Sequence, residues 1–453
     1  MAAIARQIAL SVLNSLDDPH VTLDSLLVQA FKKRPRLIQP DRALANELVF
    51  GVLRWRARLD WVIKDLSNTP IDRIDPPVLN IIRLGLYQIL FLSRIPVSAA
   101  VNDSVELAKD CAPPWTVRFV NAVLRNAVRL AQDIPLPGEK DDPVSAIAIG
   151  ESHPPWMVKR WVKHLGVEET KRLCKTNNQI PPVTIRANTL KVSREKLHRS
   201  LVAHVRGMRQ TRFAPEGLAL TGLKQPIGKM SPFQKGWFQV QDEAAQLITY
   251  LLDPKEGETI LDACAGLGGK TGHIAQLMKN SGVLRAMDRE AWKLRSLRTA
   301  TKRLGISTVT TWHRDLSSPV ADNFASTFDR ILVDAPCSGL GVIRRNPDIK
   351  WKKREEDLLR LQRRQGRLLA TLAPLVKRGG WLVYCVCSLE PEEGDRVVDA
   401  FLKSHSDFAI TRSPCTLSEM NEHFVDTSGI FRTAQNQHNM DGFFAVRLKK
   451  VGP

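Results

Sequence analysis

The chain has 453 residues, which is too long for one ordinary domain and predicts two or three. Its hydrophobic fraction of 43% and charged fraction of 25% are typical of globular proteins and exclude a disordered or collagen-like chain. With 66 Lys and Arg against 47 Asp and Glu, the net charge of +19 favours a polyanionic partner, nucleic acid first, although a well-solvated surface also accounts for it.

The spacing of apolar residues in 1–135 predicts a helical domain. Apolar residues recur every three or four positions from Leu44 to Leu66, which indicates one long helix that starts near Asp41. Amphipathic stretches at 78–92, 99–109 and 115–130 are separated by prolines, as is typical of a helix bundle. Residues 133–143 lack a period and are rich in proline and charge, so we interpret them as a linker after a first domain at 1–140.

Two further domains are predicted beyond this linker. Residues 144–245 indicate a small basic α+β domain with strands at 183–187, 217–220 and 236–239. In the third domain, 246–453, apolar strands alternate with helical stretches. Its strands are expected at 259–264, 282–287, 309–313, 330–333, 381–386 and 443–448. This alternation predicts an α/β fold with a largely parallel, doubly wound sheet.

A glycine-rich loop follows the first strand of the third domain and reads Leu261-Asp-Ala-Cys-Ala-Gly-Leu-Gly-Gly-Lys-Thr271. Glycines there let the backbone approach a ligand closely. The second strand ends at Asp288, where an acidic residue accepts hydrogen bonds from ribose hydroxyls, and the third ends near Asp315, on the adenine side. The pattern predicts a nucleoside cofactor, with a plain tight turn as the alternative.

A P-loop is another interpretation of the same loop. Its motif requires a glycine six residues before Lys270, and Cys264 occupies that position. The strand that ends at Asp334 resembles one that supplies a magnesium aspartate. Without the first glycine, however, the turn that wraps the phosphates is lost. We therefore expect neither a nucleoside triphosphatase nor a bound metal.

Two cysteine motifs follow later strands, Asp334-Ala-Pro-Cys337-Ser-Gly and Tyr384-Cys-Val-Cys387-Ser-Leu-Glu-Pro-Glu-Glu393. Both lie at the carboxyl ends of predicted parallel strands, where ligands bind in such sheets. A lone cysteine is usually a small buried hydrophobe. Two cysteines beside an aspartate and a glycine-rich loop instead indicate a reaction centre.

These motifs resemble those of the RNA cytosine-C5 methyltransferase family, whose members carry Asp-x-Cys-Ala-x-Pro-Gly-Gly-Lys-Thr, Asp-x-Pro-Cys-Ser-Gly and Thr-Cys-Ser. Residues 185–191 and 238–242 resemble the family's segments before the cofactor loop, and 97–107 and 119–126 resemble a NusB-like helical domain. The resemblance covers nearly the whole chain. It implies a Rossmann-like class I methyltransferase domain preceded by a NusB-like RNA-binding domain. Leu267 in place of proline and Val386 in place of threonine depart from the family pattern.

The resemblance implies transfer of a methyl group from S-adenosylmethionine to C5 of a cytosine. That carbon is too weak a nucleophile unaided, so Cys387 would add to C6, and Cys337 would assist product release as a base. Asp334 would hold the base through N3 and the exocyclic amine. The implied cofactor residues are Cys264, Ala265, Gly266, Leu267, Gly268, Gly269, Lys270, Asp288, Asp315 and Asp334.

A basic cluster follows the Pro-Cys motif and consists of Arg344, Arg345, Lys350, Lys352, Lys353 and Arg354. It would clamp phosphates beside the target base or would form a solvated charged face. Trp351 within it would stack on a base or pack in a core.

Features that the sequence lacks indicate the compartment in which the protein acts. No apolar run reaches the roughly 18 to 20 residues of a membrane span, and we expect no signal peptide. Seven cysteines without a CxxC pair favour free thiols in a reducing cytoplasm. We expect a monomer that binds small-subunit ribosomal RNA, with no DNA or membrane partner. A transfer RNA enzyme, a DNA cytosine enzyme that uses the Pro-Cys cysteine, and a non-catalytic RNA-binding factor remain alternatives.

Overall fold

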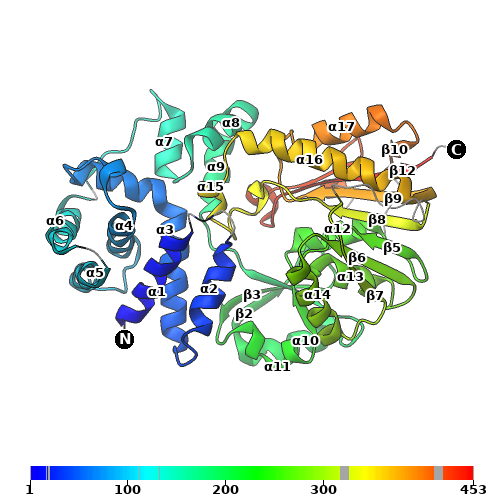
Figure 1. Cartoon of the computed structure of the whole chain (residues 1–453), viewed down its shortest axis with the longest axis horizontal. Coiled ribbons are helices and arrows are strands. Elements are labelled where there is room, and N and C mark those ends of the chain that lie inside the picture. Colours follow the sequence, from blue (N-terminus) through cyan, green and yellow to red (C-terminus); the bar gives the residue numbers. More distant parts are fainter. Residues whose placement is uncertain are drawn as a thin grey trace. The chain divides into compact units, whose positions relative to one another are not determined.

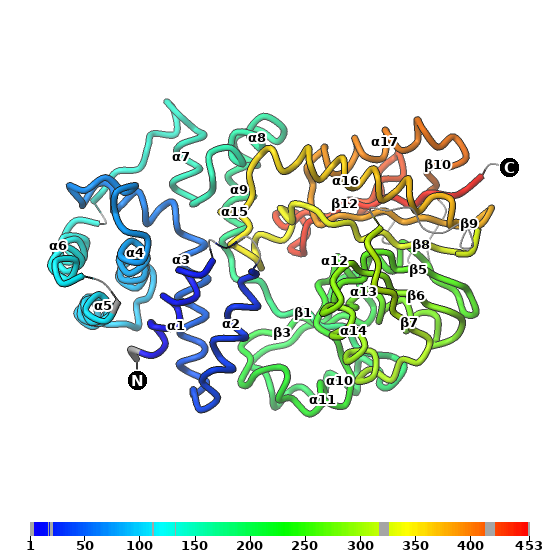
Figure 2. The backbone as a smooth tube through the Cα atoms, in the orientation of Figure 1, coloured from blue at the N-terminus to red at the C-terminus, as the bar shows by residue number. Residues whose placement is uncertain are grey.

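The computed structural model describes residues 2–16, 18, 21–111, 113–131, 133–316, 326–412 and 422–451. The chain forms two compact units, which we call the helical unit (Met1–Ile180 and Ile343–Lys353) and the sheet unit (Pro181–Val342 and Arg354–Pro453). Their elements are labelled in Figure 1, and Figure 2 traces the backbone. The three domain boundaries predicted from the sequence are finer than this division and remain predictions.

The helical unit confirms the predicted bundle. Its helices are α1 (Ala2–Ser15), α2 (Leu23–Lys32), α3 (Gln39–Leu66), α4 (Pro76–Phe91), α5 (Val97–Cys111), α6 (Pro114–Leu130), α7 (Pro143–Gly150), α8 (Pro155–Leu165), α9 (Val167–Asn177) and the short α15 (Ile349–Lys352). Prolines lie in the first turn of α3, α4, α6, α7 and α8, where no backbone N–H is needed for the helix. The predicted long helix is α3.

The basic segment after the Pro-Cys motif lies within the helical unit. The side chains of Arg344 and Lys350 are each only 1% exposed, so a phosphate clamp formed by these two residues is wrong. The Lys350 ammonium donates hydrogen bonds to the Arg54 carbonyl at 2.8 Å, the Ser152 carbonyl at 2.7 Å and the Asn178 side-chain oxygen at 3.1 Å. The chain therefore uses these charges to hold its own backbone together.

Trp351 packs against the core of the helical unit, which confirms the core alternative for this residue. Its indole N–H donates to the Leu53 carbonyl at 2.7 Å. Lys352 likewise donates to the Val21 carbonyl at 2.7 Å. The sequence alone could not distinguish packing in the core from RNA binding, because charged and aromatic residues serve both purposes.

Substituting Lys350 by methionine tests this buried ammonium. Burial lowers its pKa from 10.5 to about 7, so the folded chain binds this proton less tightly than the unfolded chain does. Between about pH 7 and 10.5 unfolding takes up a proton, and the free energy of unfolding should rise with pH by up to about 1.4 kcal/mol per unit. Urea denaturation at a series of pH values should show this rise in the wild type and not in Lys350→Met. Parallel pH profiles for the two proteins would contradict the assignment.

The first part of the sheet unit is the small α+β segment expected from the sequence. Strands β1 (Val183–Ala187), β2 (Val205–Gln210), β3 (Gly217–Leu223) and β4 (Phe238–Val240) form an antiparallel sheet in the order β2-β3-β1-β4. Helices α10 (Arg194–Leu201) and α11 (Ser231–Gln234) contribute to its core. Strand β2 was not predicted, because its residues VRGMRQ lack an apolar run.

The main sheet has the order β10-β12-β9-β8-β5-β6-β7, and β11 pairs with β12. Its strands are β5 (Thr259–Asp262), β6 (Val283–Asp288), β7 (Val309–His313), β8 (Phe328–Asp334), β9 (Val376–Val386), β10 (Phe408–Ile410), β11 (Ile430–Thr433) and β12 (Phe443–Lys450). Strands β5 to β9 pair in parallel, whereas β12 is antiparallel to β9, β10 and β11. The sheet is therefore mixed at one end and parallel where the site lies.

Helices cover both faces of this sheet, as the predicted doubly wound arrangement requires. Helices α16 (Glu356–Leu372) and α17 (Asp395–Ser404) pack against one face, and α12 (Glu243–Leu252) and α13 (Gly269–Leu277) pack against the other (Figure 1). Helix α14 (Ala291–Leu304) joins β6 and β7. Within the described residues, no helix has the length and apolarity needed to span a bilayer.

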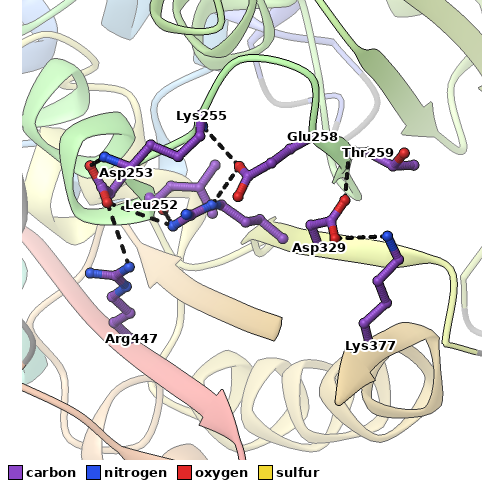
Figure 3. Close-up of polar contacts among 9 residues, drawn as sticks. Leu252, Asp253, Lys255, Glu258, Thr259, Asp329, Lys377 and Arg447 are labelled. Atoms are coloured by element: carbon purple, nitrogen blue, oxygen red, sulfur yellow. Dashed lines mark hydrogen bonds and ion pairs between the residues drawn. The ribbon is translucent and has the colours of Figure 1, made fainter. Parts of the chain in front are cut away.

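Charged side chains tie the amino-terminal ends of the central strands together (Figure 3). Arg330 of β8 donates to Glu258 at 2.6 Å and lies 3.8 Å from Asp253, which is also 3.8 Å from Arg447 of β12. Asp329 accepts from the backbone N–H of Thr259 at 2.8 Å and from Lys377 at 2.7 Å. These contacts join β5, β8, β9 and β12 at the edge opposite their ligand-binding ends.

Candidate active site

The strand order reverses between β5 and β8, which both pair in parallel with their neighbours. In such sheets ligands bind outside the carboxyl ends of the strands, at the point of reversal. Asp262 ends β5, Asp288 ends β6 and Asp334 ends β8, while Cys387 directly follows β9. The predicted site residues therefore lie along one edge of the sheet.

The glycine-rich loop connects β5 to α13 in a conformation that needs glycine. Gly266 and Gly268 have positive φ angles of 55° and 86°, and a side chain added at Gly268 would come within 2.7 Å of Leu297. The loop is fastened by hydrogen bonds from the Gly266 N–H to Asp288 at 2.9 Å and from the Thr271 hydroxyl to Asp262 at 2.6 Å. Leu267, which replaces the family's proline, is 55% exposed and leaves these bonds in place.

Asp262 was not among the predicted site residues. It is buried, and burial raises its pKa to about 7, although the bond from Thr271 opposes that rise. Its sequence signal was only its place at the end of the first strand. Its structural role is to hold the start of α13 against β5.

A pocket at this edge is lined by some of the predicted cofactor-binding residues. Its walls include Cys264, Asp288 and Asp315, together with Ala263, Arg289, Lys293, Arg314, Leu316, Pro336, Arg364 and Leu368. Carboxylates suit ribose hydroxyls, and the apolar walls suit an adenine ring. The space beside Gly266 and Gly269 is open, because a side chain added at either would meet nothing within 4 Å. The residues present thus fit a nucleoside cofactor such as S-adenosylmethionine. Ala265 to Lys270 form the loop and the first turn of α13 and are not among the residues lining this pocket.

Lys270 turns toward the end of β8. Its ammonium lies 2.7 Å from an Asp334 oxygen and 5.0 Å from the centre of the Phe443 ring. Burial lowers the pKa of Lys270, but the nearby Asp334 carboxylate and Cys385 raise it more, so the net pKa is raised and Lys270 stays charged. A lysine engaged in this way argues against a P-loop, in which it would reach phosphates.

The two motif cysteines come together. Sγ of Cys337 and Sγ of Cys387 are 3.3 Å apart. The hydrogen bond to Cys387, followed by burial, raises the pKa of Cys337 well above its ordinary value. Because the thiolate is the reactive form of cysteine, the raised pKa makes Cys337 poorly suited to be the nucleophile.

The other described cysteines of the sheet unit are poorly suited to this chemistry. Burial raises the pKa values of Cys264 and Cys385, and Asp334 adds to both shifts. The Cys385 thiol donates to Asp334 at 3.4 Å, so this additional cysteine orients the carboxylate. Among the described residues, no group of three His, Cys, Asp or Glu side chains is placed to hold a metal ion.

The fold and the site together define a class of enzyme. A glycine-rich loop after the first parallel strand, an acidic residue at the end of the second, and a pocket at the reversal of strand order are the features of a class I S-adenosylmethionine-dependent methyltransferase. Comparison with known proteins narrows this class.

Family models match three segments of the chain: the NusB family over 3–129, the ferredoxin-like domain of RsmF/B-like methyltransferases over 153–225, and the 16S rRNA methyltransferase RsmB/F over 249–449. Proteins named probable ribosomal RNA small subunit methyltransferase B from Synechocystis sp. and Bacillus subtilis are each 37% identical, over 99% of both chains. The chain belongs to the 16S rRNA methyltransferase RsmB/F family. It is an S-adenosylmethionine-dependent RNA methyltransferase, and the predicted NusB-like domain is confirmed.

Solved structures agree with this assignment. The crystal structure of PH0851 has a TM-score of 0.84 with 26% identity over 99% of each chain. A methyltransferase homolog protein from Pyrococcus horikoshii has a TM-score of 0.59 with 28% identity, covering 68% of this chain and 99% of its own.

Replacing Asp288 by alanine should weaken cofactor binding and leave RNA binding unchanged. The substitution removes the acceptor for the backbone N–H groups of Gly266 and Glu290, at 2.9 and 2.8 Å, and opens the pocket wall. Hydrogen bonds to charged groups contribute about 1.5 to 3 kcal/mol each, so the Kd for S-adenosylmethionine should rise about 10- to 100-fold. Calorimetry with cofactor and with RNA measures both, and Asp329→Ala at the opposite edge is the control. Equal losses for the two ligands would count against the cofactor role.

Proposed function

We propose that this protein methylates C5 of one cytosine in small-subunit ribosomal RNA, with Cys387 as the covalent nucleophile and Cys337 as the group that assists release. The observation that carries the proposal is the 3.3 Å contact of these two thiols beside the Lys270–Asp334 pair. The names of the relatives from Synechocystis sp. and Bacillus subtilis support the choice of RNA.

The two sulfurs take part in different steps of the reaction. The Cys387 thiolate forms a bond to C6 of the cytosine, which makes C5 nucleophilic. C5 then bonds to the methyl carbon as that carbon's bond to sulfur breaks. Cys337 first gives its proton to solvent and then, as a thiolate, takes the proton from C5. The electron pair of the broken C5–H bond forms the C5–C6 double bond as the C6–S bond breaks, which restores the aromatic ring and the Cys387 thiolate. Two thiols 3.3 Å apart suit this division, because both can reach the same base.

Asp334 is placed to hold the target base. Its side chain is 33% exposed, and one of its oxygens lies 2.7 Å from the Lys270 ammonium. A charged carboxylate accepts from the exocyclic amine of cytosine, and uracil has no such donor. Asp334 therefore supports selection of cytosine as well as orientation of C6 toward Cys387. Lys270 and Cys385 act on the reaction through Asp334.

The cofactor supplies the methyl group when it is bound. We assign its site to the loop from Cys264 to Lys270, to Asp288 for the ribose and to Asp315 for the adenine side. The pocket that contains Cys264, Asp288 and Asp315 supports this assignment. The target base must leave any stack or pair to reach the sulfur, so the substrate cytosine is unpaired or flipped out.

A monomer acting in the cytoplasm is part of the same proposal, because ribosomal RNA is the substrate. A transfer RNA substrate is the nearest alternative, since the C5 chemistry would be the same. A DNA cytosine enzyme is disfavoured by the raised pKa of Cys337, the thiol that such an enzyme would use as nucleophile. A non-catalytic binding factor would need neither the paired thiols nor the Lys270–Asp334 pair.

Separate cysteine substitutions test the nucleophile. With labelled S-adenosylmethionine and unmethylated small-subunit ribosomal RNA, Cys387→Ala should lower transfer by a factor on the order of 10⁴ to 10⁶. Cys337→Ser should instead trap a covalent protein–RNA adduct, visible on a denaturing gel, because release lacks its base. Cys385→Ser should form no lasting adduct. Trapping with Cys387→Ala, or transfer only to another RNA, would overturn the nucleophile or the substrate respectively.

A further inference from the structure

Glu393 is a buried carboxylate close to the two catalytic loops. It ends the motif that begins at Cys387, and its side chain is 0% exposed. Such a group is retained in a protein interior only where several donors satisfy it. The partners of this carboxylate therefore indicate its role.

The Glu393 carboxylate accepts hydrogen bonds from Ser338, which follows Cys337, and from Gln365. One oxygen accepts from the backbone N–H of Ser338 at 2.8 Å, and the other accepts from the Ser338 hydroxyl. Gln365 of α16 donates at 3.1 Å to the first oxygen. The same Gln365 amide nitrogen also donates to the Pro336 carbonyl at 3.0 Å. The residues on both sides of Cys337 are thus fixed through Glu393 and Gln365.

The backbone of Glu393 is fixed separately. Its carbonyl accepts from the Tyr384 hydroxyl of β9 at 2.6 Å, and its N–H donates to Glu390 at 3.0 Å. Cys387 itself is held by a different bond, from the Gly341 N–H to its carbonyl at 2.9 Å. Gly341 lies in the same loop as Ser338, and the Ser338 and Ser388 hydroxyls, 3.2 Å apart, also link the two cysteine loops. The Gly341 carbonyl, however, accepts from the Gly442 N–H at 2.8 Å, a bond that does not involve Glu393. We therefore expect removal of the carboxylate to release the residues next to Cys337 and to leave the backbone anchor of Cys387 in place.

We propose that Glu393 is a positioning residue that holds Cys337 where it can take the C5 proton, so that its carboxylate serves product release rather than adduct formation. This inference rests on the proposed function, because it presupposes that Cys337 assists release. Glu393 touches neither base nor cofactor in this role. It acts through Ser338 and, together with Gln365, through Pro336.

The experiment measures adduct formation and release separately in Glu393→Ala. Rapid-quench reactions with S-adenosylmethionine and small-subunit ribosomal RNA give the rate of the covalent protein–RNA band and the rate of free methylated product. Adduct formation should stay within a few-fold of the wild type. Release should slow about 100-fold, as expected when a reacting group moves by about 1 Å. The KM for S-adenosylmethionine should not change.

Two matched variants separate positioning from charge and from general damage. Glu393→Gln keeps the length of the side chain and an oxygen for the Ser338 N–H, so it should restore most of the release rate. Glu392→Gln makes the same chemical change one residue earlier, where the carboxylate pairs with Arg396 at 3.0 Å, and should release product like the wild type. Failure of Glu393→Gln to rescue would overturn positioning by hydrogen bonds.

Cys337→Ser and Cys387→Ala in the same assay keep the two proposals apart. If Cys387→Ala still forms adduct, the proposed function fails. If both cysteine variants behave as expected and Glu393→Ala releases product at the wild-type rate, or forms no adduct, only the role of Glu393 fails. Should Glu393→Ala not fold, as judged by loss of cofactor binding, Gln365→Met decides in the same way, because it removes the donor to Pro336 and Glu393.

Discussion

Parallel pairing of β8 with β9 places the reacting groups of this protein next to one another. In this pairing Asp334 lies opposite Cys385, and β5 pairs with the other side of β8. Because neighbouring strands run in the same direction, the residues that follow them emerge at one edge of the sheet. The loops that contain Cys337 and Cys387 therefore meet, with their sulfurs 3.3 Å apart. The glycine-rich loop after β5 places the cofactor pocket along the same edge.

Burial then decides which of the adjacent polar groups can react. Cys264, Cys337 and Cys385 have raised pKa values, each with burial among its causes, so their thiols hold protons more tightly than an exposed thiol does. Lys270 stays charged because Asp334 more than offsets the cost of its burial. Four sulfurs lie near one edge, and the 3.3 Å contact joins the two to which we assign the roles of nucleophile and assistant.

The two edges of the main sheet carry charge for different purposes. At the amino-terminal edge Asp253, Glu258, Arg330 and Arg447 neutralise one another and join strands. At the carboxyl edge the charges face a pocket and a half-exposed aspartate. Removing one partner from a buried pair is costly because it leaves an unpaired charge. The network at the amino-terminal edge therefore holds the strands in fixed positions. Because the strands are fixed, the loops at the opposite edge have a defined geometry.

The class of fold, the family and the chemical motifs could be predicted from the amino-acid sequence, because they depend on local patterns. The strands at 183–187 and 309–313 were predicted with the bounds that the structure has, since β-branched and apolar runs there are short and well delimited. Strands β2, β10 and β11 were not predicted, because they are polar or only three to four residues long and are defined by their neighbours in the sheet. The motifs likewise brought Cys387, Cys337 and the cofactor loop into the predicted site.

Contacts between residues that are distant in the sequence became known from the folded chain. Lys350 and Arg54 are 296 positions apart, and no local pattern shows that a lysine in a basic cluster donates to a buried carbonyl instead of to phosphate. Glu393 stood in a motif already singled out, but its bonds to Ser338 and Gln365 depend on how α16 packs beside β8 and β9. The identity of a charged residue in a sequence does not show whether the folded chain buries it or exposes it to solvent. Its role is set by the dielectric environment and the partners that folding provides.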